Sequence, residues 1–326
     1  MAELTLVEAV NRALAHALAE DPSVIVFGED VGRDGGVFRA TDGLFRRFGA
    51  ERVLDTPIAE AAIAGIAVGM AAHGLRPVAE IQFMGFLYAT LDQLLNHASR
   101  LRNRTRGRLA CPLVLRAPYG GGIHAPEHHS ESGEAIFAHV PGLRVVVPSS
   151  PARAYGLLLA AIRDPDPVLF LEPKRCYRAW REDVRDDGRA LALDRCFVLR
   201  AGADLTLVSW GAMLTETLAA ADQLASEGID AEVIDVATLK PLDAATICAS
   251  AARTGRVVIV HEAPLAGGLG GEIAALLAER CLFDLLAPVR RVAGWDTVMP
   301  LAKLERHYLP SCARIVAAAR EVMCYR

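Results

Sequence analysis

Three features are missing from this sequence of 326 residues, and each absence removes a class of function. No stretch is rich in lysine or arginine and the formal net charge is −4, so the electrostatic signature of a nucleic-acid-binding protein is absent. The longest apolar run, residues 61–72, has 12 residues, whereas roughly 20 are needed to cross a bilayer. The first residues mix apolar and acidic side chains and do not form a signal peptide. We therefore expect a soluble protein that binds neither nucleic acid nor membranes.

Cysteine is also used sparsely. The seven cysteines are scattered and form neither a C-x-x-C pair nor a dense framework. This pattern is typical of proteins from a reducing compartment, so we expect a cytoplasmic location.

The residues that are present predict two α/β domains, since a single core stops growing near about 250–300 residues. Short, almost continuously apolar runs alternate with helical patterns, which favours parallel strands covered on both faces. Strands are expected at 23–28, 76–81, 111–116, 143–149, 167–172, 204–211, 229–236 and 255–262. Helices are expected at 5–19, 58–73, 87–101, 151–163, 213–227, 243–252 and 268–280. The charged segment 176–203, with room for a short hairpin, reads as a linker between domains at 1–175 and 204–326.

Glu60 stands in the stretch "DTPIAEAAIAG", at the start of an apolar helix that Thr56 would cap. An acid in the first helical turn interacts favourably with the helix dipole, which would explain it without any function. Its neighbours, however, leave little polar surface, so the carboxylate should be desolvated and seek a specific partner. Gly65 and Gly69 on the same helix allow another backbone to approach closely, either at a subunit interface or on the parent sheet.

Two loops combine several polar groups. "YGGGIHAPEHHSES" (119–132) contains His124, His128 and His129 but no H-E-x-x-H motif, so an acid–base histidine on a flexible loop is a better interpretation than a zinc site. "HEAPLAGGLGGE" (261–272) resembles a phosphate-binding turn, but it lacks G-x-G-x-x-G spacing and a Walker lysine, and its glycines can equally shape a turn.

Taken together, these motifs resemble the beta subunit of the thiamin-diphosphate-dependent first component of 2-oxo acid dehydrogenase complexes. The resemblance runs almost end to end, through "VIVFGEDVGRDGGVFRAT", "RVLDTPIAEAAIAGIAVGMAAHGLRPVAEIQF", "HHSESGEAIFAHVPGLRVVVPSSP", "DPVLFLEPKRCYRAW", "VIDVATLKPLD" and "RVAGWDTVMP". It implies a pyrimidine-binding domain followed by a transketolase-type C-terminal domain.

The resemblance also implies roles for single residues. Glu60 would hydrogen-bond a ring nitrogen of the aminopyrimidine of thiamin diphosphate and favour the tautomer that acts as the internal base. Phe86 would pack on the pyrimidine, with Gln82 and Glu29 nearby. His129 would face the reacting carbon and assist the 2-oxo acid or the transfer of the acyl group to lipoamide.

Part of the expected cofactor site is missing from the sequence. Members of the family hold the diphosphate through Mg²⁺ with a G-D-G motif, and the nearest string here, Thr41-Asp42-Gly43, does not follow a suitable strand. The resemblance therefore implies an alpha subunit that holds Mg²⁺, in an α2β2 heterotetramer, and a lipoyl acyltransferase component as the next partner. By family analogy a structural K⁺ is expected near 111–114 and 161–166.

The substrate is not fixed by these patterns. "EIQFMGF" and "RNRTRGRLACPLVLRAPYGGG" favour pyruvate, whereas "EPKR" is also common among branched-chain 2-oxo acid dehydrogenases, whose substrate would be 3-methyl-2-oxobutanoate. Two further alternatives remain: a nucleotide- or flavin-binding electron-transfer subunit, and a subunit that is mainly a scaffold.

Overall fold

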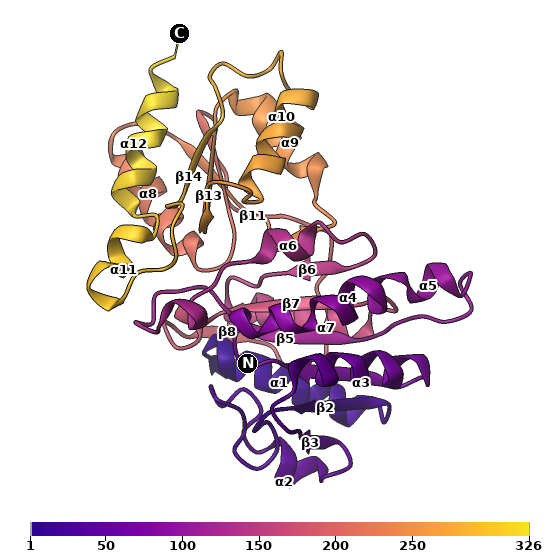
Figure 1. Ribbon diagram of the computed structural model, residues 1–326. Helices are drawn as coiled ribbons and strands as arrows, with labels where there is room; N and C mark the ends of the chain where they lie inside the picture. Colours follow the sequence, from indigo (N-terminus) through magenta and orange to yellow (C-terminus); the bar gives the residue numbers. More distant parts are fainter. Residues whose placement is uncertain (1, 326) are drawn as a thin grey trace. The chain divides into compact units, whose positions relative to one another are not determined.

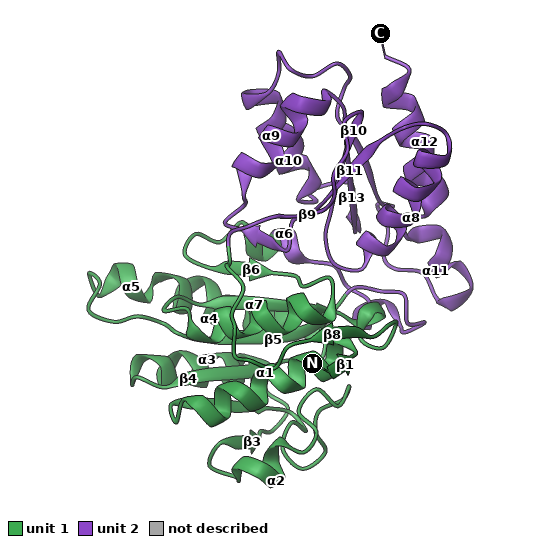
Figure 2. Cartoon of the chain, turned by 180° about the vertical axis from the view of Figure 1, so that it is seen from behind, with its two compact units in different colours: residues 1–119, 136–193 green, residues 120–135, 194–326 purple. Residues whose placement is uncertain are grey.

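The computed structural model describes residues 2–325 and separates them into two units (Figure 2). The first unit contains the chain up to Tyr119 together with Ile136–Leu193. The second contains Gly120–Ala135 and the chain from Asp194 onward. The "HHSES" loop, which the sequence places in the first domain, thus belongs to the second unit.

A parallel sheet forms the centre of the first unit, with its strands in the order β6-β7-β5-β4-β2-β3 (Figure 1). Its strands are β2 (Val24–Gly28), β3 (Val53–Asp55), β4 (Arg76–Glu80), β5 (Val114–Tyr119), β6 (Arg144–Val146) and β7 (Val168–Pro173). β2, β5 and β7 are buried along their whole length, as the continuous apolar runs predict. A separate antiparallel pair joins β1 (Ala2–Leu4) to β8 (Glu182–Val184).

Helices cover both faces of this sheet. The β3-α3-β4 and β6-α7-β7 connections cross the sheet in opposite directions, so right-handed crossovers place α3 and α7 on opposite faces. The α-helices that begin and end in this unit are α1 (Leu6–Glu20), α2 (Leu44–Phe48), α3 (Glu60–Ala72), α4 (Leu91–Asn96), α5 (Leu101–Arg104) and α7 (Pro151–Arg163). Short 3₁₀ turns are η1 (Met84–Thr90), η2 (Ala98–Arg100) and η4 (Lys174–Cys176). The single helix expected at 87–101 is therefore wrong: it is broken into short α and 3₁₀ segments.

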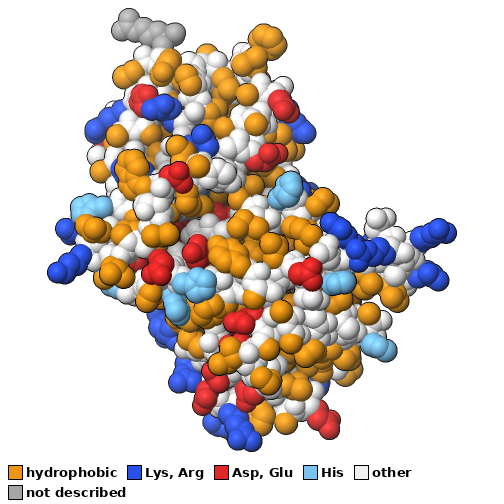
Figure 3. Space-filling model, viewed as in Figure 1, with side chains coloured by type: hydrophobic (Ala, Val, Ile, Leu, Met, Phe, Trp, Pro, Cys, Tyr) orange, Lys and Arg blue, Asp and Glu red, His pale blue; other side chains and the backbone are white. Residues whose placement is uncertain are grey.

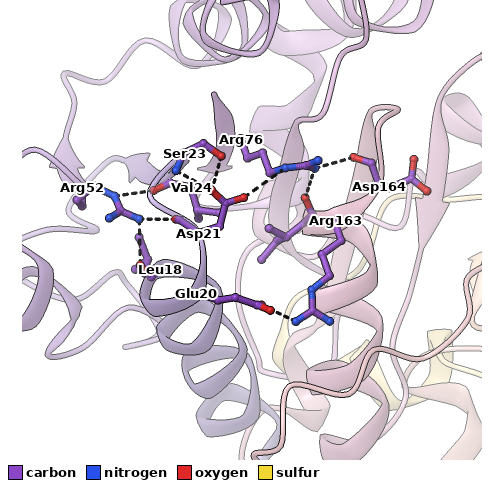
Figure 4. Close-up of polar contacts among 10 residues, drawn as sticks. Leu18, Glu20, Asp21, Ser23, Val24, Arg52, Arg76, Arg163 and Asp164 are labelled. Atoms are coloured by element: carbon purple, nitrogen blue, oxygen red, sulfur yellow. Dashed lines mark hydrogen bonds and ion pairs between the residues drawn. The ribbon is translucent and has the colours of Figure 1, made fainter. Parts of the chain in front are cut away.

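Arginines fix the end of the sheet where the strands begin (Figure 4). Arg52 donates to the carbonyl oxygens of Leu18, Asp21 and Val24, which joins the end of α1 to the start of β2. Arg76 donates to the carbonyl oxygen of Ile162 at 2.8 Å and to that of Asp164 at 3.2 Å, just where α7 ends. Cations beside the last carbonyls of a helix stabilise it, so these contacts fix the helices to the sheet.

The second unit contains a smaller sheet in the order β14-β13-β10-β11-β9. The strands of this unit are β9 (Phe197–Arg200), β10 (Leu205–Ser209), β11 (Ala231–Asp235), β12 (Thr238–Lys240), β13 (Val257–Pro264) and β14 (Arg290–Gly294). Its helices are α8 (Met213–Ser226), α9 (Ala244–Thr254), α10 (Gly270–Arg280), α11 (Ala302–Tyr308) and α12 (Cys312–Met323). η3 (Glu127–His129) also belongs to it, and α6 (Glu134–Ala138) begins in it and continues into the first unit.

The sequence leaves room for a short hairpin within residues 176–203, and this hairpin is not formed. β8 pairs antiparallel with β1, and β9 pairs antiparallel with β11, so each strand of the segment extends a sheet of its own unit. No helix within residues 2–325 is both long enough and apolar enough to cross a membrane.

Candidate functional site

Glu60 is the first residue of α3, in a position that the sequence predicts only approximately. The expected cap at Thr56 is wrong, because the helix begins four residues later and its N-cap, Ala59, makes no side-chain hydrogen bond. Glu60 is half-buried. The carboxylate thus lies beside the unsatisfied N–H groups of the first turn, which favour a negative charge.

A second carboxyl group, that of Glu29, lies close to Glu60. Glu29 follows β2, whose last residue, Gly28, is the parallel partner of Asp55 at the end of β3. The Glu29 side chain is buried, and this burial, followed by the charges of Glu60 and Asp30, raises its pKa. The two carboxyl groups meet at the carboxyl edge of a parallel sheet, where such folds bind their ligands.

Two buried oxygens at this edge have no hydrogen-bond partner among residues 2–325. They are Oε1 of Glu29 and Oγ1 of Thr56, and the Thr56 backbone N–H donates to the carbonyl of Gly28 at 2.9 Å. Buried polar atoms are almost always satisfied, so the expected partner of these two oxygens is a polar ligand group or a water molecule. A carboxyl group and a hydroxyl group beside Glu60 are suitable partners for the nitrogens of an aminopyrimidine.

The other side chains implied by the resemblance come from the segment after β4. Gln82 donates through Nε2 to Asp30 Oδ2 at 3.0 Å, which links this segment to the loop after β2. Phe86 lies in η1, half-buried, with its ring 5.8 Å from that of Phe83 in an edge-to-face arrangement. The first unit therefore brings Glu29, Gln82 and Phe86 to the edge where α3 begins.

The apolar surface around Glu60 is open in this chain. Ile58 is 83% exposed and Ile66 is 52% exposed, and hydrophobic side chains are visible over this part of the unit (Figure 3). Gly69 is exposed and a Cβ added to it would contact nothing within 4 Å, whereas one on Gly65 would lie 3.3 Å from Gln93. The full desolvation of Glu60 that the sequence predicts is thus not achieved by this chain alone.

His129 lies in the second unit, on the loop between β5 and α6. It ends the short η3 turn, and its N–H donates to the carbonyl of Pro126 at 3.0 Å. His129 is half-buried, whereas His124 and His128 are exposed. The His128 and His129 rings are 6.5 Å apart and edge-to-face, so the two imidazoles are directed differently.

Several polar groups of this unit carry no role in the sequence patterns. Glu262 and Glu305 are both buried and both accept hydrogen bonds from the loop that carries His129. Sequence reasoning misses them because they lie far from the loop along the chain. Burial also raises the pKa of Tyr308, an effect reinforced by Glu262 and other nearby acids.

The glycine-rich turn after β13 has a structural explanation. Added Cβ atoms at Gly268 and Gly270 would each lie 2.6 Å from the ring of His261. That ring stacks on Trp210 at 5.3 Å, and burial lowers its pKa to about 4. The glycines therefore let the turn pack on a neutral, buried imidazole, which removes the main support for a nucleotide-binding subunit.

Within residues 2–325, no group of three or more His, Cys, Asp or Glu side chains could hold a metal ion. In the segment where a monovalent cation is expected, the carbonyl oxygens of Ile162 and Asp164 already accept hydrogen bonds from Arg76. A monovalent cation would have to share these oxygens with the guanidinium.

Comparison with known proteins gives a consistent result for both units. Residues 2–179 match the model of the transketolase pyrimidine-binding domain, and residues 194–315 match that of the transketolase C-terminal domain. Similar chains include the pyruvate dehydrogenase E1 component subunit beta of Acholeplasma laidlawii, 47% identical, covering 99% of this chain and 98% of the relative. The corresponding subunit of Bacillus subtilis is 46% identical, and the 2-oxoisovalerate dehydrogenase subunit beta of the same organism is 45% identical, with 99% of each chain covered.

A solved structure has the same arrangement of elements. It is described as a split-gene transketolase, inactive beta4 tetramer, and it matches with a TM-score of 0.82 and 28% identity over 99% of both chains. The likeness confirms the transketolase-like fold that the sequence predicts.

Proposed function

Because this chain belongs to the family of beta subunits of 2-oxo acid dehydrogenase E1 components, built from transketolase pyrimidine-binding and C-terminal domains, we propose that it supplies half of a thiamin-diphosphate site. With its alpha subunit it catalyses the oxidative decarboxylation of a 2-oxo acid and transfers the acyl group to a lipoyl acyltransferase component. The observation that carries this proposal is the group formed by Glu29, Thr56 and Glu60, with its two unpaired buried oxygens.

These residues fit the pyrimidine end of the cofactor. When bound, thiamin diphosphate supplies an acidic thiazolium carbon and an electron sink for decarboxylation. Glu60 would hold a proton at a ring nitrogen of the aminopyrimidine, and the unpaired Oε1 of Glu29 would be available to the same ring. Phe86 would contact the ring, and Gln82 orders the neighbouring loop through its hydrogen bond to Asp30.

His129 is assigned to a later step of the reaction. Its half-buried imidazole lies on a loop together with Ser130 and Glu131, which also line a cavity of about 370 Å³ in the second unit. Histidine can exchange a proton near neutral pH, and the opening of a dithiolane requires one: a nucleophilic carbon bonds to one sulfur, the S–S bond breaks, and the second sulfur leaves as a thiolate that takes up a proton. We assign His129 to the 2-oxo acid and to acyl transfer, with weaker roles for His124 and His128.

The chain needs an alpha subunit because it lacks a diphosphate-binding motif. The exposed apolar surface formed by Ile66 and Gly69 of α3 and by Ile58 just before it suits that interface, and the alpha subunit would hold Mg²⁺ in a cytoplasmic heterotetramer of two alpha and two beta subunits. The matched split-gene transketolase, described as an inactive beta4 tetramer, supports the dependence on a second chain.

Pyruvate is the proposed substrate, with 3-methyl-2-oxobutanoate as the alternative. The identities of 47% and 46% to pyruvate dehydrogenase subunits and 45% to a 2-oxoisovalerate dehydrogenase subunit do not separate them. Steady-state turnover of both acids by the co-expressed alpha and beta subunits is the test. A higher kcat/KM for pyruvate supports the proposal, and a higher value for the branched acid overturns it in favour of the alternative.

A further inference from the structure

The loop that carries His129 is bound by two carboxylates from distant parts of the second unit. Glu262 lies on β13 and Glu305 on α11, and each side chain belongs to a residue that is only 2% exposed. The N–H of Gly121 donates to Glu262 Oε1. The N–H groups of Gly122 and His124 donate to the two oxygens of Glu305, at 2.6 and 3.2 Å.

Side chains add to these backbone contacts. Ser132 donates through Oγ to Glu262 Oε1 at 3.2 Å, and His124 Nδ1 lies 2.7 Å from Glu305 Oε2. At the far end of the loop, Trp210 Nε1 donates to Glu134 Oε1 at 3.2 Å. The segment with His129 is therefore held on both sides, by contacts before it and after it in the chain.

The triple glycine that opens the loop is explained by this arrangement. Gly120 has φ +80°, and a Cβ there would lie 2.9 Å from Glu262 Oε1. At Gly121 a Cβ would lie 2.5 Å from the terminal methyl of Met299. The glycines thus allow two carboxylates to reach the backbone, and they do so in a loop that is anchored rather than free.

A buried carboxylate is costly unless donors surround it, and an ionised one can only accept hydrogen bonds. Backbone N–H groups that converge in a turn form a concave site for an anion. Here the acceptors are the carboxyl groups of Glu262 and Glu305. Both accept hydrogen bonds from backbone N–H groups of the loop, so the loop helps to satisfy both buried side chains.

We propose that Glu262 and Glu305 are positioning residues that hold the loop 120–132 in the conformation that presents His129 for acyl transfer. The kinetic part of this proposal rests on the proposed function. The anchoring of the loop does not rest on the proposed function, because it consists of hydrogen bonds within this chain.

The test is Glu305→Gln in the reconstituted heterotetramer, read by amide hydrogen exchange of a peptide spanning the loop. Glutamine keeps the size of the side chain but presents an amide N–H to one of the loop donors. The amide hydrogen-exchange rate of this peptide should rise by about an order of magnitude, while the exchange rates of β10 and α8 stay unchanged. Acyl transfer to a lipoyl domain should fall about tenfold or more, because a small misplacement of a reacting group is costly.

Glu232→Gln is the matched control. Glu232 is also a buried carboxylate of this unit, but it accepts from the side chains of Ser250 and Arg253 instead of from the loop. Loop exchange should stay at the wild-type value in this variant. Glu262→Gln provides a second, independent test of the anchor.

The outcomes are distinguishable. Unchanged loop exchange in both Glu305→Gln and Glu262→Gln overturns the anchoring. Raised exchange with normal acyl transfer overturns the positioning role. If acyl transfer and thiazolium proton exchange fall together with the melting temperature, the role is merely structural and the proposal also fails. If His129→Ala leaves acyl transfer intact, the assignment of His129 fails, whatever the loop exchange shows.

Discussion

At the scale of single residues, Glu60 combines a position at a helix N-terminus with a second carboxyl group close by. Burial, and after it the charge of Glu60, raises the pKa of Glu29. Of these two neighbouring acids, only Glu60 stands at the start of α3. We infer that Glu60 is the group that exchanges a proton with the pyrimidine.

Replacement of Glu60 by glutamine should therefore lower turnover by roughly 10²–10⁴-fold, the usual loss for one acid–base group, while assembly with the alpha subunit persists. Glutamine preserves the volume of the side chain but cannot take or give the proton. NMR measurement of deuterium exchange at the thiazolium carbon is the direct readout. An exchange rate equal to that of the wild-type heterotetramer would sink the assignment.

His129→Ala should affect a later step. Thiazolium proton exchange should remain close to the wild-type rate, because in this proposal His129 acts only after that proton has been lost. Acyl transfer to a lipoyl domain should fall sharply. Single-turnover kinetics separate the two steps, and an equal loss in both would contradict this role.

The sequence motifs predict which residues are candidates for the functional site, but they do not predict which contacts position these residues. Glu60 and His129 stand out because acids and histidines are concentrated in short, otherwise apolar or glycine-rich stretches. Glu305 gives no such signal, since its contacts with Gly122 and His124 join positions about 180 residues apart. Long-range hydrogen bonds of this kind follow from tertiary packing and have no local pattern.

At the scale of secondary-structure elements, strands β4, β5 and β7 are joined by a buried ionic network. Arg116 donates through Nε and Nη2 to both oxygens of Glu172, at 2.7 and 3.0 Å, and through Nη1 to Glu80 at 2.8 Å. The Tyr177 hydroxyl donates to Glu172 at 2.7 Å. All four side chains are buried, so the network fixes the register of three neighbouring strands directly before the loops that carry Gln82 and the glycines.

Arg116→Met should destabilise the chain by about 3–5 kcal/mol, because it leaves two buried carboxylates without their cation. Urea unfolding of the wild-type and variant chains at one fixed protein concentration measures the loss. Arg102→Met is a suitable control, since Arg102 forms only a partly exposed ion pair with Asp166. A loss at Arg116 no greater than that of the control would show that the network does not stabilise the sheet.

The same network predicts a pH dependence. Burial raises the pKa of Glu80 above its ordinary value of 4.5, against the effect of Arg116. A carboxyl group with a raised pKa in the folded state contributes stability below its ordinary pKa and loses it as the pH rises through the raised value. The stability of Glu80→Gln relative to wild type should therefore increase from pH 4 upward, and a pH-independent difference would contradict this.

Most elements are predictable from sequence because their signals are local. The hydroxyl cap of Ser150 and the proline after it define the start of α7, and Thr5 with Glu8 forms a capping box at α1. The segment 87–101 is mispredicted because apolar residues three or four apart fit α and 3₁₀ turns equally well. No strand or helix is predicted beyond residue 280, although the structure forms β14, α11 and α12 there, because the apolar runs in this region are short and interrupted.

At the scale of the whole molecule, we propose that this chain is one half of a site. Unpaired oxygens of Glu29 and Thr56 lie at the carboxyl edge of its first sheet, and Ile58 and Ile66 are exposed just before and on the adjacent helix α3. It has no diphosphate-binding motif in its sequence. Exposed apolar patches promote association, so the chain expressed alone should self-associate.

Calorimetric titration of thiamin diphosphate with Mg²⁺ into the lone chain and into the reconstituted heterotetramer tests this central claim most directly. The lone chain should give no saturable heat, because it binds only the pyrimidine end and lacks the groups that hold the diphosphate. The heterotetramer should bind the cofactor stoichiometrically. Tight, stoichiometric binding by the lone chain would contradict the account.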